Sequence, residues 1–235
     1  MLAHSLDRMS PEPELRSARV WDLPTRAFHW LLAATVVASI VSAKIGGNAM
    51  AWHMRFGLLA MALLLFRLAW GFVGGHWSRF TSFVYGPRQV LEYLRGASGP
   101  AGRYDVGHSP LGSLSVFALI ALLVCQVATG LVADDEIATL GPLNRFVEPA
   151  LALKATGWHE TFGQYLIIAM VVLHVAAVAY YRLGKERDLI GAMWHGDQPV
   201  PAGAPVSADG VPQRSLALLL FAAAAALAWW IGSLG

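Results

Sequence analysis

Five long apolar runs constrain this chain more than any other feature of its sequence. A helix needs about 20 mainly apolar residues to cross the roughly 30 Å hydrocarbon core of a bilayer. Only 14% of the 235 residues are charged, whereas a soluble domain carries about 25%. We therefore predict an all-α integral membrane protein with membrane-spanning helices at residues 27–43, 56–73, 110–133, 161–181 and 215–234.

Arg67 interrupts the second of these runs. An arginine near the centre of a membrane helix costs roughly 2.5–3.5 kcal/mol on the insertion scale, whereas each Leu, Phe or Val favours insertion by about 0.3–0.6 kcal/mol. The run contains ten residues of these three types. We therefore expect it to span the membrane despite the charge.

The basic residues between the runs predict the orientation of the chain. Segments on one side of the membrane contain twelve Lys and Arg residues, and segments on the other side contain four. The positive-inside rule then predicts that the N-terminus lies in the cytoplasm and the C-terminus on the outer side of the membrane. The twelve are Arg8, Arg16, Arg19, Arg26, Arg79, Arg88, Arg95, Arg103, Arg182, Lys185, Arg187 and Arg214, and the four are Lys44, Arg55, Arg145 and Lys154.

The same pattern suggests a division of the chain into four parts. Residues 1–26 lack the apolar core of a secretory signal and are expected to form a cytoplasmic N-terminal segment. Residues 27–197 contain the first four helices, which we expect to form a four-helix bundle. Residues 198–214 are rich in Pro, Gly, Ala and Ser, as linkers are, and lead to an extra C-terminal transmembrane helix within 215–235. The net charge of +2 provides no basic face for nucleic acid.

Four of the eight histidines lie in or at the ends of the predicted spans. Ionisable groups are rare in such positions and usually mark a functional site. These four are His29, His53, His159 and His174. The other four lie in the predicted cytoplasmic segments, where we expect solvated or headgroup-facing side chains, and they are His4, His76, His108 and His195.

A repeated motif relates two of the histidines in the spans. Residues 52–57 and 158–163 both read W-H-x-x-F-G, and both precede or open helices that enter from the outer side. His53 and His159 should therefore lie at the same depth. Gly57 and Gly163 follow four residues later, one turn deeper on the same helical face, where we expect a cleared surface that a flat macrocycle could approach.

The other two histidines are predicted to form a second level. His174 follows His159 by fifteen residues, which places it about 22 Å deeper. His29 lies just after Arg26, also towards the cytoplasm. The expected pairs are therefore His53 with His159 on the outer side and His29 with His174 on the inner side.

Two imidazoles at each level suit a haem iron held in the core of a helical bundle. The single cysteine, Cys125, cannot supply the C-x-x-C-H motif that attaches haem covalently. We therefore predict two non-covalent b haems with bis-histidine iron. For their propionates we expect Arg67 at the inner level, Lys44 at the outer level, and Arg26, although Lys44 and Arg26 could instead snorkel to the headgroups.

A second interpretation of the histidines needs no haem. A histidine-based metal transporter or a simple membrane anchor would also place imidazoles in helices. Metal pathways usually add carboxylates or thiolates, and the acid nearest the outer pair in the sequence is Glu160.

The stretch from residue 21 to 197 resembles the bacterial cytochrome b561 family, which includes the b-type cytochrome subunits of nickel–iron hydrogenases. The resemblance depends on a combination of short motifs, each weak by itself. They are Arg26-Ala-Phe-His29-Trp30, His53-x-x-x-Gly57, Arg67-Leu-Ala-Trp-Gly71, Gly107-His-Ser-Pro-Leu-Gly112, His159-Glu-Thr-Phe-Gly163 and Leu173-His174.

This resemblance implies a four-helix bundle with two b haems, and the four histidines as axial ligands in the same pairs. It also implies a bacterial inner-membrane protein whose outer side, with the C-terminus, is the periplasm. The implied activity is electron transfer between a periplasmic redox protein, such as a c-type cytochrome or a hydrogenase, and quinone in the surrounding lipid membrane. Some family members oxidise superoxide and reduce ubiquinone. A superoxide:ubiquinone oxidoreductase is therefore an alternative function, for which Lys44, Arg55 and Lys154 are the cationic candidates at the outer face.

Overall fold

The computed structural model describes residues 15–96 and 106–235 of the chain. Residues 1–14 of the expected N-terminal segment, with His4 and Arg8, lie outside the described residues, as does Arg103. The helices and strands are β1 (Leu15–Arg19), α1 (Leu23–Ile45), α2 (Met50–Val73), α3 (Pro87–Leu94), α4 (Pro110–Leu131), α5 (Pro149–Gly157), α6 (Gln164–Gly184), α7 (Leu189–His195), β2 (Asp197–Pro201) and α8 (Val211–Gly232).

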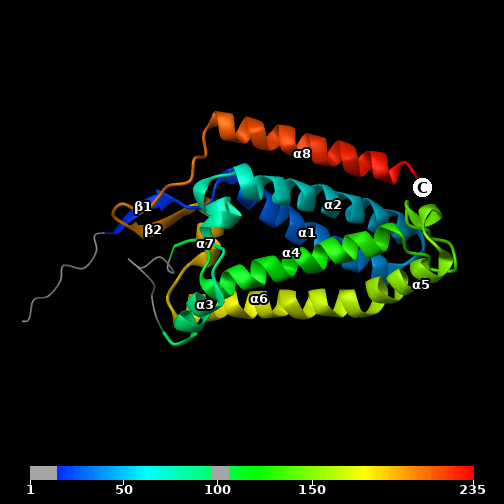
Figure 1. Ribbon diagram of the computed structural model, residues 1–235, viewed down its shortest axis with the longest axis horizontal. Coiled ribbons are helices and arrows are strands. Elements are labelled where there is room, and N and C mark those ends of the chain that lie inside the picture. The colour runs from blue at the N-terminus through cyan, green and yellow to red at the C-terminus, as the bar shows by residue number, and fades with distance from the viewer. Residues whose placement is uncertain (1–14, 97–105) are drawn as a thin grey trace, which may run out of the picture.

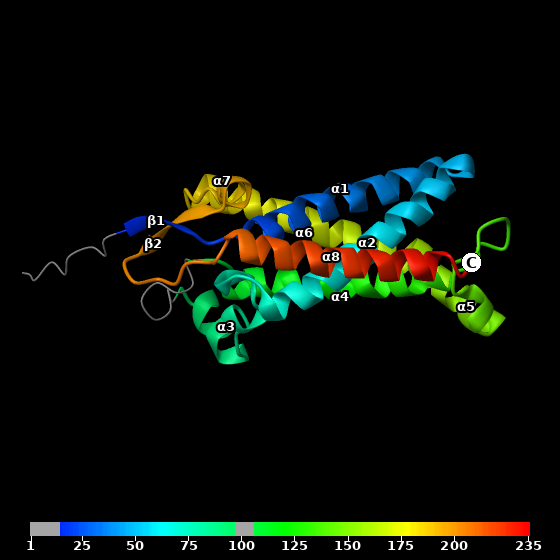
Figure 2. The same cartoon turned by 90° about the horizontal axis from the view of Figure 1, so that it is seen from above.

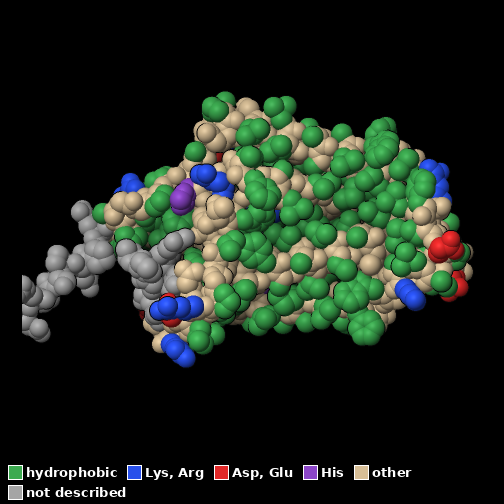
Figure 3. All heavy atoms as spheres, viewed as in Figure 1, with side chains coloured by type: hydrophobic (Ala, Val, Ile, Leu, Met, Phe, Trp, Pro, Cys, Tyr) green, Lys and Arg blue, Asp and Glu red, His purple; other side chains and the backbone are tan. Residues whose placement is uncertain are grey.

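Among the described residues, five helical segments are long and apolar enough to cross a membrane, which confirms the predicted number of spans. They contain α1, α2, α4, α6 and α8, and these helices run along the long axis of the molecule (Figure 1). Hydrophobic side chains cover the middle of the visible face, whereas charged side chains gather at its two ends (Figure 3). The chain is therefore a multi-pass membrane protein.

Four of these five spans begin earlier than the apolar runs indicate, whereas α4 begins at the predicted residue, Pro110. α1 begins at Leu23 because Asp22 caps it, accepting a hydrogen bond from the Thr25 backbone N–H at 2.8 Å, and because Pro24 suits the first helical turn. The fourth span begins at Pro149 instead of residue 161, since α5 continues through a π-helical turn, Trp158–Gly163, into α6. A search for uncharged runs misses these starts because Arg26 interrupts the beginning of α1, and Lys154 and Glu160 interrupt the fourth span before residue 161.

α2 lies at the centre of the helix packing. It contacts α1, α4 and α8, and α4 in turn contacts α6. α8 packs against α2, on the side away from α6 in Figure 1, and in Figure 2 it crosses in front of α2. The buried side chains that join α1, α2 and α8 are Phe28, Leu63, Phe66, Trp70, Ala217 and Ala224.

One end of the bundle carries a small β-ribbon, which the all-helical prediction did not include. β1 pairs with β2 in antiparallel register, with Leu15 opposite Pro201 and Arg19 opposite Asp197. We call this the sheet end, and we call the opposite end, with α5 and the loop 132–148, the loop end. A hydrophobic cluster lies beneath the ribbon and contains Ala18, Val20, Trp21, Trp77, Val106, Ala192 and Val200.

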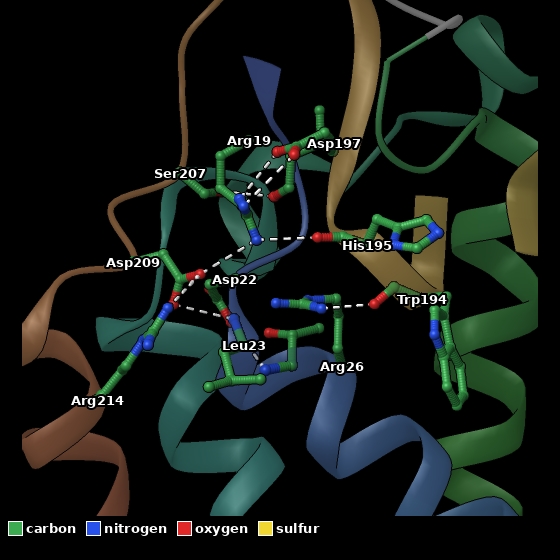
Figure 4. A network of polar contacts seen from close by, with 12 residues as sticks. Arg19, Asp22, Leu23, Arg26, Trp194, His195, Asp197, Ser207, Asp209 and Arg214 are labelled. Carbon is green, nitrogen blue, oxygen red and sulfur yellow. Dashed lines mark hydrogen bonds and ion pairs between the residues drawn. The ribbon is translucent and has the colours of Figure 1, made fainter. Parts of the chain in front are cut away.

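The segment expected to be a linker, 198–214, is held in place by polar contacts at the sheet end (Figure 4). Asp209 accepts hydrogen bonds from the Leu23 backbone N–H at 3.1 Å and from Arg214 Nε at 3.1 Å. Arg19 Nε forms an ion pair with Asp197 at 2.9 Å. The chain before α8 is thereby attached to the start of α1.

Candidate functional site

The first candidate site lies at the loop end, where α2 brings His53 towards His159 of the π-helical turn. The two ring centroids are 5.8 Å apart and the rings are inclined at 81°. Two imidazoles that bind one metal ion through bonds of about 2 Å place their centroids roughly 6 Å apart. We call His53 and His159 the outer pair.

Hydrogen bonds from neighbouring helices orient both rings of the outer pair. His53 Nδ1 lies 2.9 Å from the Ser39 carbonyl oxygen of α1, and His159 Nδ1 lies 2.8 Å from the Gln126 carbonyl oxygen of α4. A carbonyl only accepts, so each Nδ1 carries the hydrogen and each Nε2 keeps its lone pair. Metal-binding histidines use this arrangement, because the bond fixes the tautomer and makes the free nitrogen a better ligand.

A cavity of about 660 Å³ opens beside the outer pair. It lies among α1, α2, α4 and the fourth span, and both His53 and His159 line it, as do Lys44 and Gly57. Cavities of about 300–1,000 Å³ are typical of cofactor sites. The space and the ligands therefore fit a macrocycle whose metal lies between the two rings.

The two glycines of the repeated motif have different surroundings. A Cβ on Gly57 would meet no atom within 4 Å, so this position is open. A Cβ on Gly163 would instead overlap the Gln126 side chain and the Trp158 indole, so the cleared surface that we expected there is not found. Gly130 of α4 makes room for His159, since a Cβ there would lie 2.7 Å from His159 Cε1.

The second candidate site lies nearer the sheet end, where His29 of α1 faces His174 of α6. The ring centroids are 6.3 Å apart, at 51°, again the separation of two imidazoles on one metal ion. His29 Nδ1 is buried and has no hydrogen-bond partner among the described residues. We call these two residues the inner pair.

The three cations expected near the site occupy different environments. Arg67 is only 3% exposed, and its Nη1 has no hydrogen-bond partner in the described part of the chain. Lys44 lines the cavity of the outer pair. Arg26 Nη1 donates to the Trp194 carbonyl at 2.6 Å, which ties it to α7 at the sheet end (Figure 4).

The number of protein ligands also fits a porphyrin. Each pair supplies two imidazoles, and within residues 15–96 and 106–235 no group of three or more His, Cys, Asp or Glu side chains could hold a metal ion. A porphyrin provides four nitrogen atoms and leaves two axial positions to the protein. Two imidazoles per site are therefore a suitable donor set for haem iron.

Sequence reasoning missed the residues that support the outer pair. Ser39 and Gln126 act through backbone carbonyls, which every residue has, so no sequence pattern could have identified them. Gly130 could not be identified from the sequence either, because its contact with His159 joins positions 29 residues apart. His108, expected to be solvated, instead lies between the rings of Trp21 and Phe83.

Comparison with known proteins gives a family for this arrangement. Residues 20–196 match the family described as prokaryotic cytochrome b561. The chain is 25% identical over 211 residues to the probable Ni/Fe-hydrogenase 1 B-type cytochrome subunit of Escherichia coli K12, covering 75% of this chain and 88% of that protein. It is 26% identical over 216 residues to the probable Ni/Fe-hydrogenase B-type cytochrome subunit of Cupriavidus necator, covering 77% and 87%.

The matched region contains all four helices that carry or support the two histidine pairs, and α8 follows it. A match over residues 20–196 covers well over half of the chain. The chain belongs to the prokaryotic cytochrome b561 family.

Proposed function

We propose that this protein is a dihaem b-type cytochrome of a bacterial inner membrane. In this proposal it transfers single electrons between a periplasmic redox protein and the quinone pool. The observation that carries the proposal is the presence of two histidine pairs, with ring centroids 5.8 and 6.3 Å apart, at different depths of one helical bundle.

The outer pair would hold one b haem and the inner pair the other. Haem supplies the one-electron chemistry when bound, whereas the chain sets ligation, orientation and exclusion of water. The Ser39 and Gln126 carbonyls keep the two outer imidazoles in the tautomer that leaves Nε2 free for iron. Lys44 and Arg67 are the proposed partners for the propionates, at the outer and inner levels respectively.

The depth of the two pairs supports electron transfer across the membrane. Ser39, which orients the outer pair, follows His29 of the inner pair by ten residues of α1, or about 15 Å along the helix axis. Two redox centres separated in this way would carry an electron across much of the bilayer. A single centre at either level would not.

The distribution of charge supports the proposed orientation. The sheet end carries Arg16, Arg19 and Arg26, which favours the cytoplasmic side, and the loop end carries the acidic stretch Asp134 to Glu136. The names of the relatives, hydrogenase cytochrome subunits, favour a hydrogenase as the redox partner. The same orientation would place the C-terminus, at the loop end, in the periplasm.

Haem content is the direct test of the dihaem assignment. A pyridine haemochrome titration of the purified protein should give two b haems per chain. His174→Ala should reduce this to one, because each pair binds its own iron, and His195→Ala is the matched control at an exposed histidine. One haem in the native protein would contradict the dihaem assignment. Stoichiometric zinc without a Soret band would contradict the proposal and favour the metal-transport or anchor alternative.

Fusion proteins test the orientation. Alkaline phosphatase folds only in the oxidising periplasm, because it needs disulfides. Fused after Gly235, it should be active, and fused after Gly203 at the sheet end it should be inactive. The opposite result would place the loop end in the cytoplasm and exclude a periplasmic partner at the outer pair.

One observation favours a second candidate, a superoxide:ubiquinone oxidoreductase. Lys44 lines the cavity of the outer pair and would attract an anion to it. Arg55, another of the candidate cations, lies over the Trp52 ring at 4.7 Å. Reduction of the purified protein by superoxide, lost in Lys44→Gln and retained in Lys154→Gln, would support this activity.

A further inference from the structure

Three buried nitrogen atoms near the inner pair lack hydrogen-bond partners among the described residues. They are His29 Nδ1 of α1, Arg67 Nη1 of α2 and His108 Nδ1, just before α4. Phe83 contacts both Arg67 and His108, since its ring centroid lies 6.0 Å from the Arg67 guanidinium carbon and 4.4 Å from the centroid of the His108 ring. Unsatisfied buried polar atoms are uncommon in native proteins, and three in one region indicate a missing polar group.

Arg67 carries a charge, and in the part of the chain that the structure describes no acid bonds its buried Nη1. Its guanidinium lies over the Phe80 ring at 4.7 Å, with the side chain almost fully buried. The nearby carboxylate of Asp22 is already bonded by other groups. The Asp22 carboxylate accepts hydrogen bonds from four groups: the Thr25 N–H, Trp70 Nε1, the Gly75 N–H and Ser78 Oγ.

His108 adds a second donor that carries no charge. Burial, and to a smaller extent the positive charge of Arg67, lower its pKa to about 3. The imidazole is therefore neutral at pH 7 and has one N–H to donate. The edge-to-face contact with Trp21, at 4.7 Å between ring centroids, holds the ring in place.

A guanidinium with a free N–H beside a neutral imidazole suits a carboxylate. Charge-assisted bonds to a carboxylate are the strongest that a guanidinium makes, and a second donor fixes the direction of the group. The site lies close enough to the inner pair for His29 and His174 to interact electrostatically with His108. A haem bound by the inner pair would carry two carboxylates on flexible arms.

We propose that Arg67 and His108 together form a carboxylate-binding site that holds a propionate of the haem bound by His29 and His174. This inference rests on the dihaem assignment. It assigns a binding role to His108, although the sequence position of this residue alone predicts a solvated side chain.

The first test measures how fast haem leaves the native full-length protein in lipid nanodiscs, with apomyoglobin as the acceptor. The inner haem is identified as the spectral component that His29→Ala lacks. In Arg67→Gln and His108→Leu this component should dissociate about tenfold faster, as expected for a lost bond to a charged group. The outer component should keep its rate in both variants.

Two further variants separate hydrogen bonding from packing. His108→Gln retains a neutral donor, so its inner haem should dissociate more slowly than that of His108→Leu. His195→Leu, at an exposed histidine of the sheet end, should leave both rates unchanged. If Arg67→Gln does not accumulate, the difference between the two His108 variants decides the question.

The second test removes the carboxylates from the cofactor. Full-length apoprotein reconstituted with haem dimethyl ester should show no further acceleration of inner-haem loss when Arg67 is replaced by Gln. If Arg67→Gln accelerates loss of the inner dimethyl ester as much as it accelerates loss of haem, the site binds another anion, such as a lipid phosphate. That result would overturn the proposal.

The outcomes distinguish this inference from the proposed function. If the native protein holds two haems and His29→Ala removes one, but Arg67→Gln and His108→Leu leave the inner rate unchanged, the carboxylate site is wrong and the dihaem assignment stands. If His29→Ala removes no haem, both proposals fail together.

Discussion

Gly130 is the single residue on which the position of His159 depends most directly. A Cβ at residue 130 would lie 2.7 Å from His159 Cε1 and 3.1 Å from its Nδ1, so either the ring or α4 would have to move. The ring is also bonded to the Gln126 carbonyl one turn earlier on the same helix. Gly130→Ala should therefore displace His159 from the geometry of the outer pair.

The expected result of Gly130→Ala is loss of about half of the total haem, with the inner component retained. Haem spectra and haem content per chain would measure it. Gly157→Ala is the matched control, because a Cβ there meets no atom within 4 Å, and an alanine should stabilise the helix by about 0.5–1 kcal/mol. Full haem content in Gly130→Ala would show that the outer pair does not need this space.

Among the structural elements, the loop after α4 has a conformation that depends on the carboxylate of Asp135. Asp135 accepts hydrogen bonds from the backbone N–H groups of Ile137, Ala138 and Thr139 at 3.0, 2.9 and 2.8 Å. These bonds lower its pKa from 3.8 to about 2. Because the folded pKa is the lower one, the stabilising effect is fully present above pH 3.8 and is lost as the pH falls through about 2.

The Asp135 carboxyl should accordingly titrate near pH 2 in a carbon-13 spectrum of the native protein. In Asp135→Ala, the three amides should exchange hydrogen at least about threefold faster at neutral pH, since each loses its acceptor. A carboxyl midpoint near 3.8, or unchanged exchange, would show that the loop is held by other contacts.

At the scale of the whole molecule, α8 is an addition to a bundle that already contains both histidine pairs. The cavity of the outer pair is lined by α1, α2, α4, the fourth span and the loops at the loop end. α8 instead covers α2, where Ala217, Ala224 and Ala228 are buried. Its role is therefore expected to be stability or partner binding, not haem ligation.

A chain that stops after Gly210 should keep two haems, because it retains every histidine and the bonds from the Leu23 N–H and Arg19 to Asp209. Its thermal midpoint should fall by more than about 4 °C, since a loss of 1 kcal/mol lowers the midpoint of a protein of this size by roughly 2–4 °C. Haem content and thermal unfolding in lipid measure the two effects. Loss of the outer haem on truncation would make α8 part of the haem-binding bundle.

The sequence by itself determined the number of membrane spans and the depths of the histidines. Both follow from local rules: an apolar run of sufficient length partitions into hydrocarbon, and each helical residue advances about 1.5 Å. The W-H-x-x-F-G repeat placed His53 and His159 at one level for this reason. The same local rules set the helix ends only approximately, as the early starts of α1 and of the fourth span illustrate.

Only the tertiary structure decided what surrounds each histidine. The Ser39 and Gln126 carbonyls, the space at Gly130, the contact of Gly163 with Gln126 and the burial of His108 all depend on how helices are rotated against each other. The β-ribbon at the sheet end depends on pairing between strands about 180 residues apart. Such contacts arise from packing between distant segments, and hydropathy and helical periodicity contain no information about them.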